Sequence, residues 1–184
     1  MFGVIFGIVL GRNIFAALIA AAIGASPVAA QPLPNDHVIV PGVRIGSAEL
    51  APADQGSLFR QLGEPNQTDR STGHEIYRYG PPQRDGAGPD ELVVDFDIAK
   101  DQPFEISTAS PLYRTREGLG VGSTGAAIRA GLGPPLCEGG DGRGDDAVVY
   151  GAIWFLTLHG QVTKVSIREH LSRDDFRAGP LTCK

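Results

Sequence analysis

The sequence predicts an α+β protein with two tandem units, each a short helix followed by antiparallel β-strands, and with the helices packed on one face of the sheet. Two observations support this prediction. The tetrapeptide Leu-Gly-x-Pro occurs in each half of the chain, at 62–65 and at 132–135. After each occurrence, apolar residues recur at every second position, which is the period of a strand with one buried face. The sequence therefore predicts an internal repeat.

Each unit is predicted to begin with a short helix, over residues 54–62 and 124–132. Both segments start at side chains that can accept hydrogen bonds from the first helical turn. Their apolar residues lie four apart and so share one helix face. Gly63 and Gly133 are typical helix ends, and a proline two residues later prevents the helix from resuming. The capping candidates are Asp54, Ser123 and Thr124, and the apolar pairs are Leu58 with Leu62 and Ile128 with Leu132.

Three strands are predicted after each helix. In the second unit, residues 159–160 (His-Gly) are predicted to form a two-residue hairpin turn. This turn would place Trp154, Leu156 and Val165 on the face that meets the helices. The predicted strands are 75–79, 92–97 and 104–108 in the first unit, and 147–150, 152–158 and 161–167 in the second.

The opposite face of that hairpin is the predicted partner-binding surface. Its residues are Ile153, Phe155, Val162 and Lys164. Apolar side chains are unexpected on a solvated sheet face. An exposed aromatic side chain beside a cation is typical of an interface anchor. The alternative is that the C-terminal segment covers this face, with Phe176 and Leu181 lying across it.

Residues 1–30 are predicted to be a removable signal peptide, which makes the protein periplasmic or secreted. A single charge, Arg12, precedes an apolar run over 14–23, and small residues occupy 28–30. The alternative is a retained anchor, although a bilayer span needs about 20 residues. After cleavage no membrane insertion is expected. Residues 31–184 are predicted to be a single mature domain of two repeats, about 41–110 and 111–184.

The two cysteines, Cys137 and Cys183, are predicted to form a disulfide bond. An exported chain meets an oxidising environment, in which an even pair of cysteines is most simply a bridge. A metal site is the alternative, but two thiols without neighbouring histidines make a poor one.

The charge of the chain argues against nucleic acid as a partner. The formal net charge is −5, and removal of Arg12 with the signal peptide makes it more negative. An acidic surface repels a phosphate backbone. A protein partner is expected instead, and the sequence does not indicate the oligomeric state.

One resemblance to a known family rests on the second unit. Residues 118–124 read Gly-Leu-Gly-Val-Gly-Ser-Thr and are followed by Ala127-Ile128-Arg129 and by the Leu-Gly-Pro-Pro at 132–135. This order resembles the repeat of the SmpA/OmlA-like lipoproteins and of beta-lactamase inhibitory protein-like proteins. The resemblance implies a capped short helix followed by an antiparallel sheet. The lipid-anchored members carry a lipobox cysteine that this chain lacks.

No motif in the sequence indicates a cofactor or a metal site. The histidines are His37, His74, His159 and His170, and none is spaced from another as a metal-binding pair. Neither a nucleophile elbow nor a phosphate-binding loop occurs. The acidic loop at 139–146 offers three carboxylates without the order of a calcium loop, so it is interpreted as a solvated loop, with calcium as the alternative.

The expected function is that of an exported, non-catalytic protein-binding module of the bacterial cell envelope, which presents a sheet face to a protein partner. The first alternative is an enzyme whose acid and base come from carboxylates and a histidine that converge in the fold. Its candidate residues are His74, Asp95, Asp97 and Glu105. The second alternative is an envelope-stability protein without a discrete site.

Overall fold

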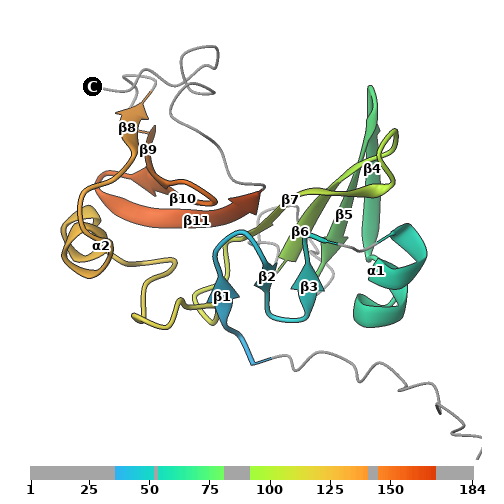
Figure 1. Ribbon diagram of the computed structural model, residues 1–184, viewed down its shortest axis with the longest axis horizontal. Helices are drawn as coiled ribbons and strands as arrows, with labels where there is room; N and C mark the ends of the chain where they lie inside the picture. The colour runs from blue at the N-terminus through green and yellow to red at the C-terminus, as the bar shows by residue number, and fades with distance from the viewer. Residues whose placement is uncertain (1–35, 52–53, 81–91, 141–144, 169–184) are drawn as a thin grey trace, which may run out of the picture. The chain divides into compact units, whose positions relative to one another are not determined.

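A computed structural model describes residues 36–51, 54–80, 92–140 and 145–168, which all belong to one compact unit (Figure 1). The predicted signal peptide, 1–30, lies outside these ranges. Within them, no helix has the length and apolar character that a membrane span requires.

An antiparallel sheet of eight strands dominates the fold, with the order β4-β5-β6-β7-β11-β10-β9-β8. The four strands after the first helix therefore form one half of the sheet, and the four strands after the second helix form the other half in reversed order. The strand bounds are Gln67–Ser71 (β4), His74–Tyr79 (β5), Leu92–Asp97 (β6), Gln102–Thr108 (β7), Cys137–Gly140 (β8), Asp145–Tyr150 (β9), Ile153–Leu158 (β10) and Gln161–Arg168 (β11).

A smaller sheet of three two-residue strands precedes the first helix. Its strands are β1 (Ile39–Val40), β2 (Arg44–Ile45) and β3 (Ala48–Glu49), which pair in sequence order. The side chains of Ile39, Ile45 and Ala48 are buried in the main hydrophobic core. The small sheet therefore shares in covering the large one.

The two helices are α1 (Gln55–Leu62) and α2 (Gly125–Leu132), each eight residues long. Asp54 caps α1 by accepting a hydrogen bond from the backbone N–H of Ser57, and Thr124 caps α2 in the same way. Both helices end at a glycine with φ of 80°, a conformation that other residues adopt at a cost. The predicted bounds and caps of both helices are therefore confirmed.

The predicted fold class is wrong. The protein is mostly β, and the strands of the two predicted units do not form separate helix-covered sheets. They merge into one sheet because β7 pairs with β11, with Ser107 opposite Ser166 and Ile106 opposite Ile167. Each helix is too short to cover a sheet, since Leu58 is the one buried residue of α1 and Ile128 the one buried residue of α2.

The predicted strands 75–79, 92–97 and 104–108 correspond to β5, β6 and β7, and those of the second unit to β9, β10 and β11. Five strands were not predicted, namely β1–β3, β4 and β8. They are short, or almost wholly exposed in the case of β4, so they lack an apolar alternation.

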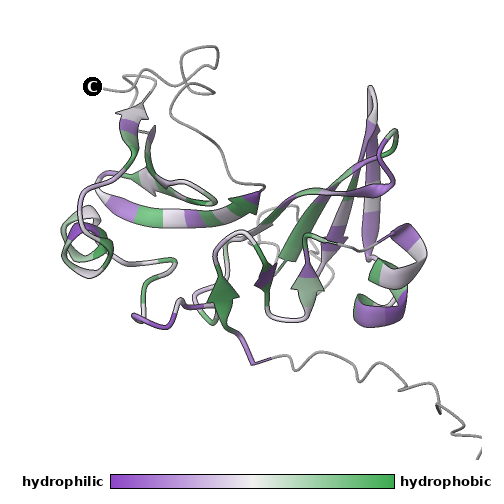
Figure 2. Cartoon of the chain, in the orientation of Figure 1, coloured by the Kyte–Doolittle hydropathy of each residue, from purple (hydrophilic) through white to green (hydrophobic). Residues whose placement is uncertain are grey.

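The main core lies on one face of the large sheet, called here the core face. It gathers side chains from α1, α2, the small sheet and both halves of the large sheet. Figure 2 shows the alternation of apolar and polar residues along β11 that separates the core face from the opposite one, called here the second face. The buried residues of β5, β6, β7, β10 and β11 on the core face include Tyr77, Val94, Phe96, Ile106, Phe155, Val165 and Ile167.

Candidate binding surface on the second face of the sheet

Polar and charged side chains of β5 and β6 share the second face because the residues between them are buried in the core. In β6, Val94 and Phe96 point to the core, so Asp95 and Asp97 point away from it. The register places His74 opposite Asp97, and Asp95 opposite Glu105 of β7. Residues directly opposite each other in an antiparallel pair lie on the same face.

His74 and Asp95 are in direct contact. The Nδ1 atom of His74 lies 2.7 Å from Oδ1 of Asp95, and both side chains are about one third exposed. An ionised carboxylate can only accept, so the proton of a neutral His74 lies on Nδ1 and leaves Nε2 as the basic nitrogen. This pair has the arrangement of a carboxylate that orients a histidine base.

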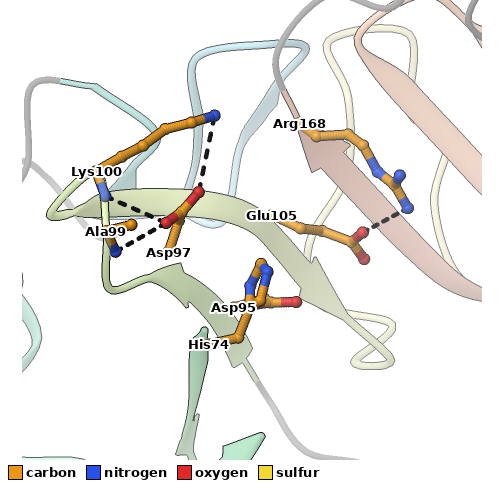
Figure 3. Close-up of polar contacts among 7 residues, drawn as sticks. All are labelled: His74, Asp95, Asp97, Ala99, Lys100, Glu105 and Arg168. Atoms are coloured by element: carbon orange, nitrogen blue, oxygen red, sulfur yellow. Dashed lines mark hydrogen bonds and ion pairs between the residues drawn. The ribbon is translucent and has the colours of Figure 1, made fainter. Parts of the chain in front are cut away.

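Asp97 faces the same side but serves the turn between β6 and β7. Its carboxylate accepts hydrogen bonds from the backbone N–H groups of Ala99 (3.0 Å) and Lys100 (3.1 Å). The ammonium group of Lys100 lies 3.7 Å from the same carboxylate. Figure 3 shows these contacts beside the His74–Asp95 pair. Asp97 is thus a structural residue that closes a turn.

Glu105 connects the two halves of the sheet. Its carboxylate lies 2.6 Å from the guanidinium of Arg168 (Figure 3). The ammonium group of Lys164, also on β11, lies 3.8 Å from the same carboxylate. Glu105 is mostly buried, whereas Lys164 is about two fifths exposed. Two cations thus surround the carboxylate of Glu105, and the carboxylate of Asp95 lies opposite Glu105 on the same face.

Phe104 is the aromatic side chain of this surface, and a β-bulge places it there. Asp95 pairs with Glu105 while Phe96 pairs with Pro103, so Phe104 is an extra residue in β7. The residue is 36% exposed. It contacts the ring of His74 edge-on, with centroids 5.6 Å apart, and the guanidinium of Arg168 lies 5.6 Å from its centroid.

Arg168 also stacks on Trp154 of β10, with the guanidinium carbon 4.0 Å from the ring centroid. It therefore lies between two aromatic rings while pairing with Glu105. We call six residues the second-face cluster: His74, Asp95, Phe104, Glu105, Lys164 and Arg168.

The predicted partner-binding surface is wrong for three of its four residues. Ile153, Phe155 and Val162 are buried in the main core. The fourth, Lys164, lies on the second face. The turn at 159–160 forms as predicted, but the β10–β11 register shifts beyond it, so that Leu156 pairs with Lys164.

That shift reverses the faces that were predicted for β10 and for Val162, whereas Val165 and Lys164 lie on the faces that were predicted for them. Thr157 pairs with Val162 and Leu156 with Lys164, which makes Thr163 an extra residue in β11. A bulge of one residue exchanges the faces of all residues on one strand relative to a regular pairing. Trp154 therefore lies on the second face, and Phe155 on the core face.

The residues of the alternative enzyme hypothesis do come together in part. His74 and Asp95 touch, and Glu105 is opposite Asp95, whereas Asp97 is engaged in the turn. Sequence reasoning missed Phe104 and Arg168 as surface residues. The predicted strand ended one residue before Arg168, and no pattern in the sequence reveals the bulge at Phe104.

Within the described ranges, no group of three histidine, cysteine or acidic residues is placed to hold a metal ion. Cys137 lies in β8, and Cys183 falls outside those ranges, so the predicted bridge stays a prediction.

A second polar network lies on the core face and joins α1 to the sheet. The hydroxyl of Tyr77 donates to the buried carboxylate of Glu75, and the amide of Gln55 in α1 donates to both groups. Arg70 pairs with Glu75 at 2.5 Å. Burial raises the pKa of Tyr77 to about 12, and the hydrogen bond from Tyr77 lowers the pKa of Glu75. This network anchors α1 to β5.

A cavity of about 450 Å³ lies beside the first turn of α2. Its charged side chains are Arg129, Glu138 and Asp146, of which Arg129 and Glu138 pair at 2.7 Å. The hydrogen bond and the charge of Glu138 raise the pKa of Arg129. The cavity thus holds an ion pair of its own.

No family model and no curated protein matches the sequence. Solved structures that resemble the fold include a DUF4309 family protein, YjgB, from Bacillus subtilis (14% identity, 68% of this chain, 84% of that chain, TM-score 0.47). Another is the uncharacterized protein YfeY from Escherichia coli (13% identity, 70% and 97%, TM-score 0.48). A third is an extracellular protein with an SCP domain from Bacillus anthracis (14% identity, 72% and 50%, TM-score 0.45). Likenesses at this level support no statement about function.

Proposed function

We propose that this protein is an exported, non-catalytic protein-binding module of the bacterial cell envelope, and that its partner contacts the second-face cluster. The signal-peptide pattern of residues 1–30 supports export to the periplasm or the outside.

The observation that carries the proposal is the exposure of Phe104 and the residues that surround its ring. Its partly exposed ring lies on a sheet face between a histidine and an arginine, and it is positioned by a bulge. Bulges that re-aim a side chain are common at functional positions. Aromatic and arginine side chains dominate the binding energy of protein interfaces. The ion pairs around Phe104 would form the polar surround of such an anchor.

The proposal is tested by crosslinking in the native envelope, followed by a binding titration with the identified partner. Phe104→Ser should weaken binding by roughly tenfold or more, as expected for an aromatic anchor. The matched control is Leu112→Ser, which removes an apolar side chain that is 61% exposed and lies outside the large sheet. Equal affinity of both variants and the wild type would remove the second-face cluster from the interface.

The contact between His74 and Asp95 favours a second candidate, a hydrolytic enzyme in which Nε2 of His74 activates water. Within the described residues, no serine or cysteine side chain hydrogen-bonds to His74, so water would be the nucleophile. A panel of ester, amide and phosphoester substrates tests this candidate. Turnover that is lost in both His74→Ala and Asp95→Asn, while Phe104→Ser retains it, would favour catalysis over binding.

A further inference from the structure

One row of side chains crosses all eight strands on the second face, and its exposure changes abruptly along the way. The row runs Gln67, Arg78, Val93, Ser107, Ser166, Trp154, Val149 and Cys137, each opposite the next in the strand pairing. The first three side chains are exposed or half-buried, and the last five are buried. The change occurs between β6 and β7.

Three of the five buried side chains of this row, Trp154, Val149 and Cys137, belong to a small apolar cluster. Its members are Cys137, Ala147, Val149 and Trp154, with Leu136 and Leu156 packed against them. All but Leu136 come from β8, β9 and β10, and none comes from α1, α2 or the small sheet, which contribute to the core on the other side. A single sheet layer does not bury its own side chains, so this cluster requires a second layer.

The composition of the chain outside the described ranges identifies the layer. Residues 52–53, 81–91 and 141–144 contain no large apolar side chain other than proline, residues 31–35 contain one, Leu33, and residues 1–30 are predicted to be removed. The C-terminal segment 169–184 carries Leu171, Phe176 and Leu181.

The C-terminal segment also starts close enough to the apolar cluster, and is long enough, to cross it. It follows Arg168 of β11, next to the buried row. Three strand spacings separate β11 from β8, which is about 14 Å at ~4.8 Å per spacing. The chain from Arg168 to Cys183 extends up to about 50 Å when fully stretched, so it can cross the cluster and reach Cys137.

We propose that residues 169–184 dock on the apolar cluster of β8–β10, that Phe176 and Leu181 pack against Trp154 and Val149, and that the predicted Cys137–Cys183 bridge fastens the docked segment. Cys137 is itself a member of the cluster, so the bridge would form where the segment ends. The docked segment covers the β8–β10 part of the second face and leaves β4–β7 and Lys164 of β11 accessible. This inference does not depend on whether the second-face cluster binds a protein.

Trp154 is the single tryptophan of the chain, so its fluorescence reports directly on whether residues 169–184 shield the apolar cluster. The first test compares acrylamide quenching of Trp154 in the full-length wild type and in Phe176→Ser/Leu181→Ser. The matched control is Ser172→Ala/Thr182→Ala, which changes polar residues of the same segment. The quenching constant should rise severalfold in the first variant and stay unchanged in the control. Far-UV circular dichroism of the same samples shows whether the sheet is retained.

A second measurement decides the question even if the double variant fails to fold. The photoreactive residue p-benzoylphenylalanine replaces Phe176 in the otherwise native chain, and crosslinked peptides are mapped by mass spectrometry. Crosslinks within one chain to peptides of β9 or β10 support the proposal. Crosslinks to β4–β6, or to a second copy of the chain, overturn the proposal. In the quenching experiment, a folded Phe176→Ser/Leu181→Ser variant in which Trp154 stays shielded from acrylamide also overturns it.

Discussion

Phe104 and Thr163 occupy equivalent positions in two hairpins of one sheet. Each is the third residue of its strand, β7 or β11, and each is the extra residue of a β-bulge. The next residues are Glu105 and Lys164, whose charged groups lie 3.8 Å apart across the β7–β11 pair. The two halves of the sheet thus meet through residues that hold the same place in each half, and the first half has an aromatic ring where the second has threonine.

Deletion of Thr163 is expected to be tolerated. Without the extra residue, Val162 stays opposite Thr157 and Lys164 stays opposite Leu156, so every side chain of β11 keeps its face. Deletion of Ser166 is the control, because it moves Ile167 from the core face to the second face. We expect a clearly higher melting temperature for the Thr163 deletion than for the Ser166 deletion. Similar melting temperatures would contradict the bulge assignment.

Leu58→Ala and Ile128→Ala should each lower the free energy of unfolding by ~2–5 kcal/mol, the range for large buried aliphatic side chains. Both side chains are fully buried, and each is the one buried residue of its helix. Leu112→Ala serves as the exposed control and should change stability little. Urea denaturation measures all three. A loss below about 1 kcal/mol at either helix would mean that the helix contributes little to the core.

Arg168→Ala is expected to lower the free energy of unfolding by about 1–3 kcal/mol, because it removes the ion pair with Glu105 and the stacking on Trp154. The matched control is Arg129→Ala, whose ion pair with Glu138 is similar in length but exposed, so that it should matter little. A double-mutant cycle with Glu105→Gln isolates the pair from the stacking. If Arg168→Ala and Arg129→Ala lower the free energy of unfolding equally, the Glu105–Arg168 contact does not stabilise the pairing of the two sheet halves.

The local parts of this fold could be predicted, and the non-local parts could not. A capping side chain and a terminal glycine define each helix within about ten residues of sequence, so both helices were found. The pairing of β7 with β11 joins residues far apart in the chain, and no local pattern encodes it. That pairing is what turns the predicted two units into one mostly β sheet.

The same distinction explains the outcome for the candidate site. The strand predicted at 92–97 alternates apolar and polar residues, and in β6 this local pattern does place Asp95 and Asp97 away from the core. The hairpin turn at 159–160 was also predicted, but a single extra residue, Thr163, reversed the faces assigned to Trp154 and Phe155. Phe155 and Val162 were therefore assigned to a surface, although they belong to the core.

The disulfide prediction is tested by peptide mapping of non-reduced protein from its native compartment. A Cys137–Cys183 bridge should give one linked peptide pair and no thiol that reacts with an alkylating reagent. By loop-entropy estimates, the bridge would add up to about 4 kcal/mol to the free energy of unfolding. Cys183→Ser should lower stability and raise the accessibility of Trp154 together, if the C-terminal segment is held as proposed. Two alkylated cysteines in the native protein would refute the bridge.

Tyr77→Phe is expected to change how stability depends on pH at both ends of the range. The hydrogen bond from Tyr77 lowers the pKa of Glu75 below its ordinary value of 4.5. A carboxyl group with a lowered pKa adds stability above its unfolded pKa, and this contribution is lost as the pH falls through the folded pKa. The loss of stability at acid pH should therefore be smaller in Tyr77→Phe than in the wild type.

At alkaline pH the sign is reversed, because burial raises the pKa of Tyr77 itself to about 12. The folded state favours the protonated phenol, so its contribution is present below the ordinary pKa of 10.0 and is lost as the pH rises toward 12. Tyr77→Phe has no such group and should show a flatter alkaline limb. Urea titrations across the pH range compare the two proteins. Tyr150→Phe is the control for the acid limb, since the hydroxyl of Tyr150 donates to the backbone carbonyl of Gly133 rather than to a carboxylate. If the acid limbs of Tyr77→Phe and the wild type coincide, Tyr77 does not lower the pKa of Glu75, and the Gln55 and Arg70 contacts alone must hold the buried carboxylate.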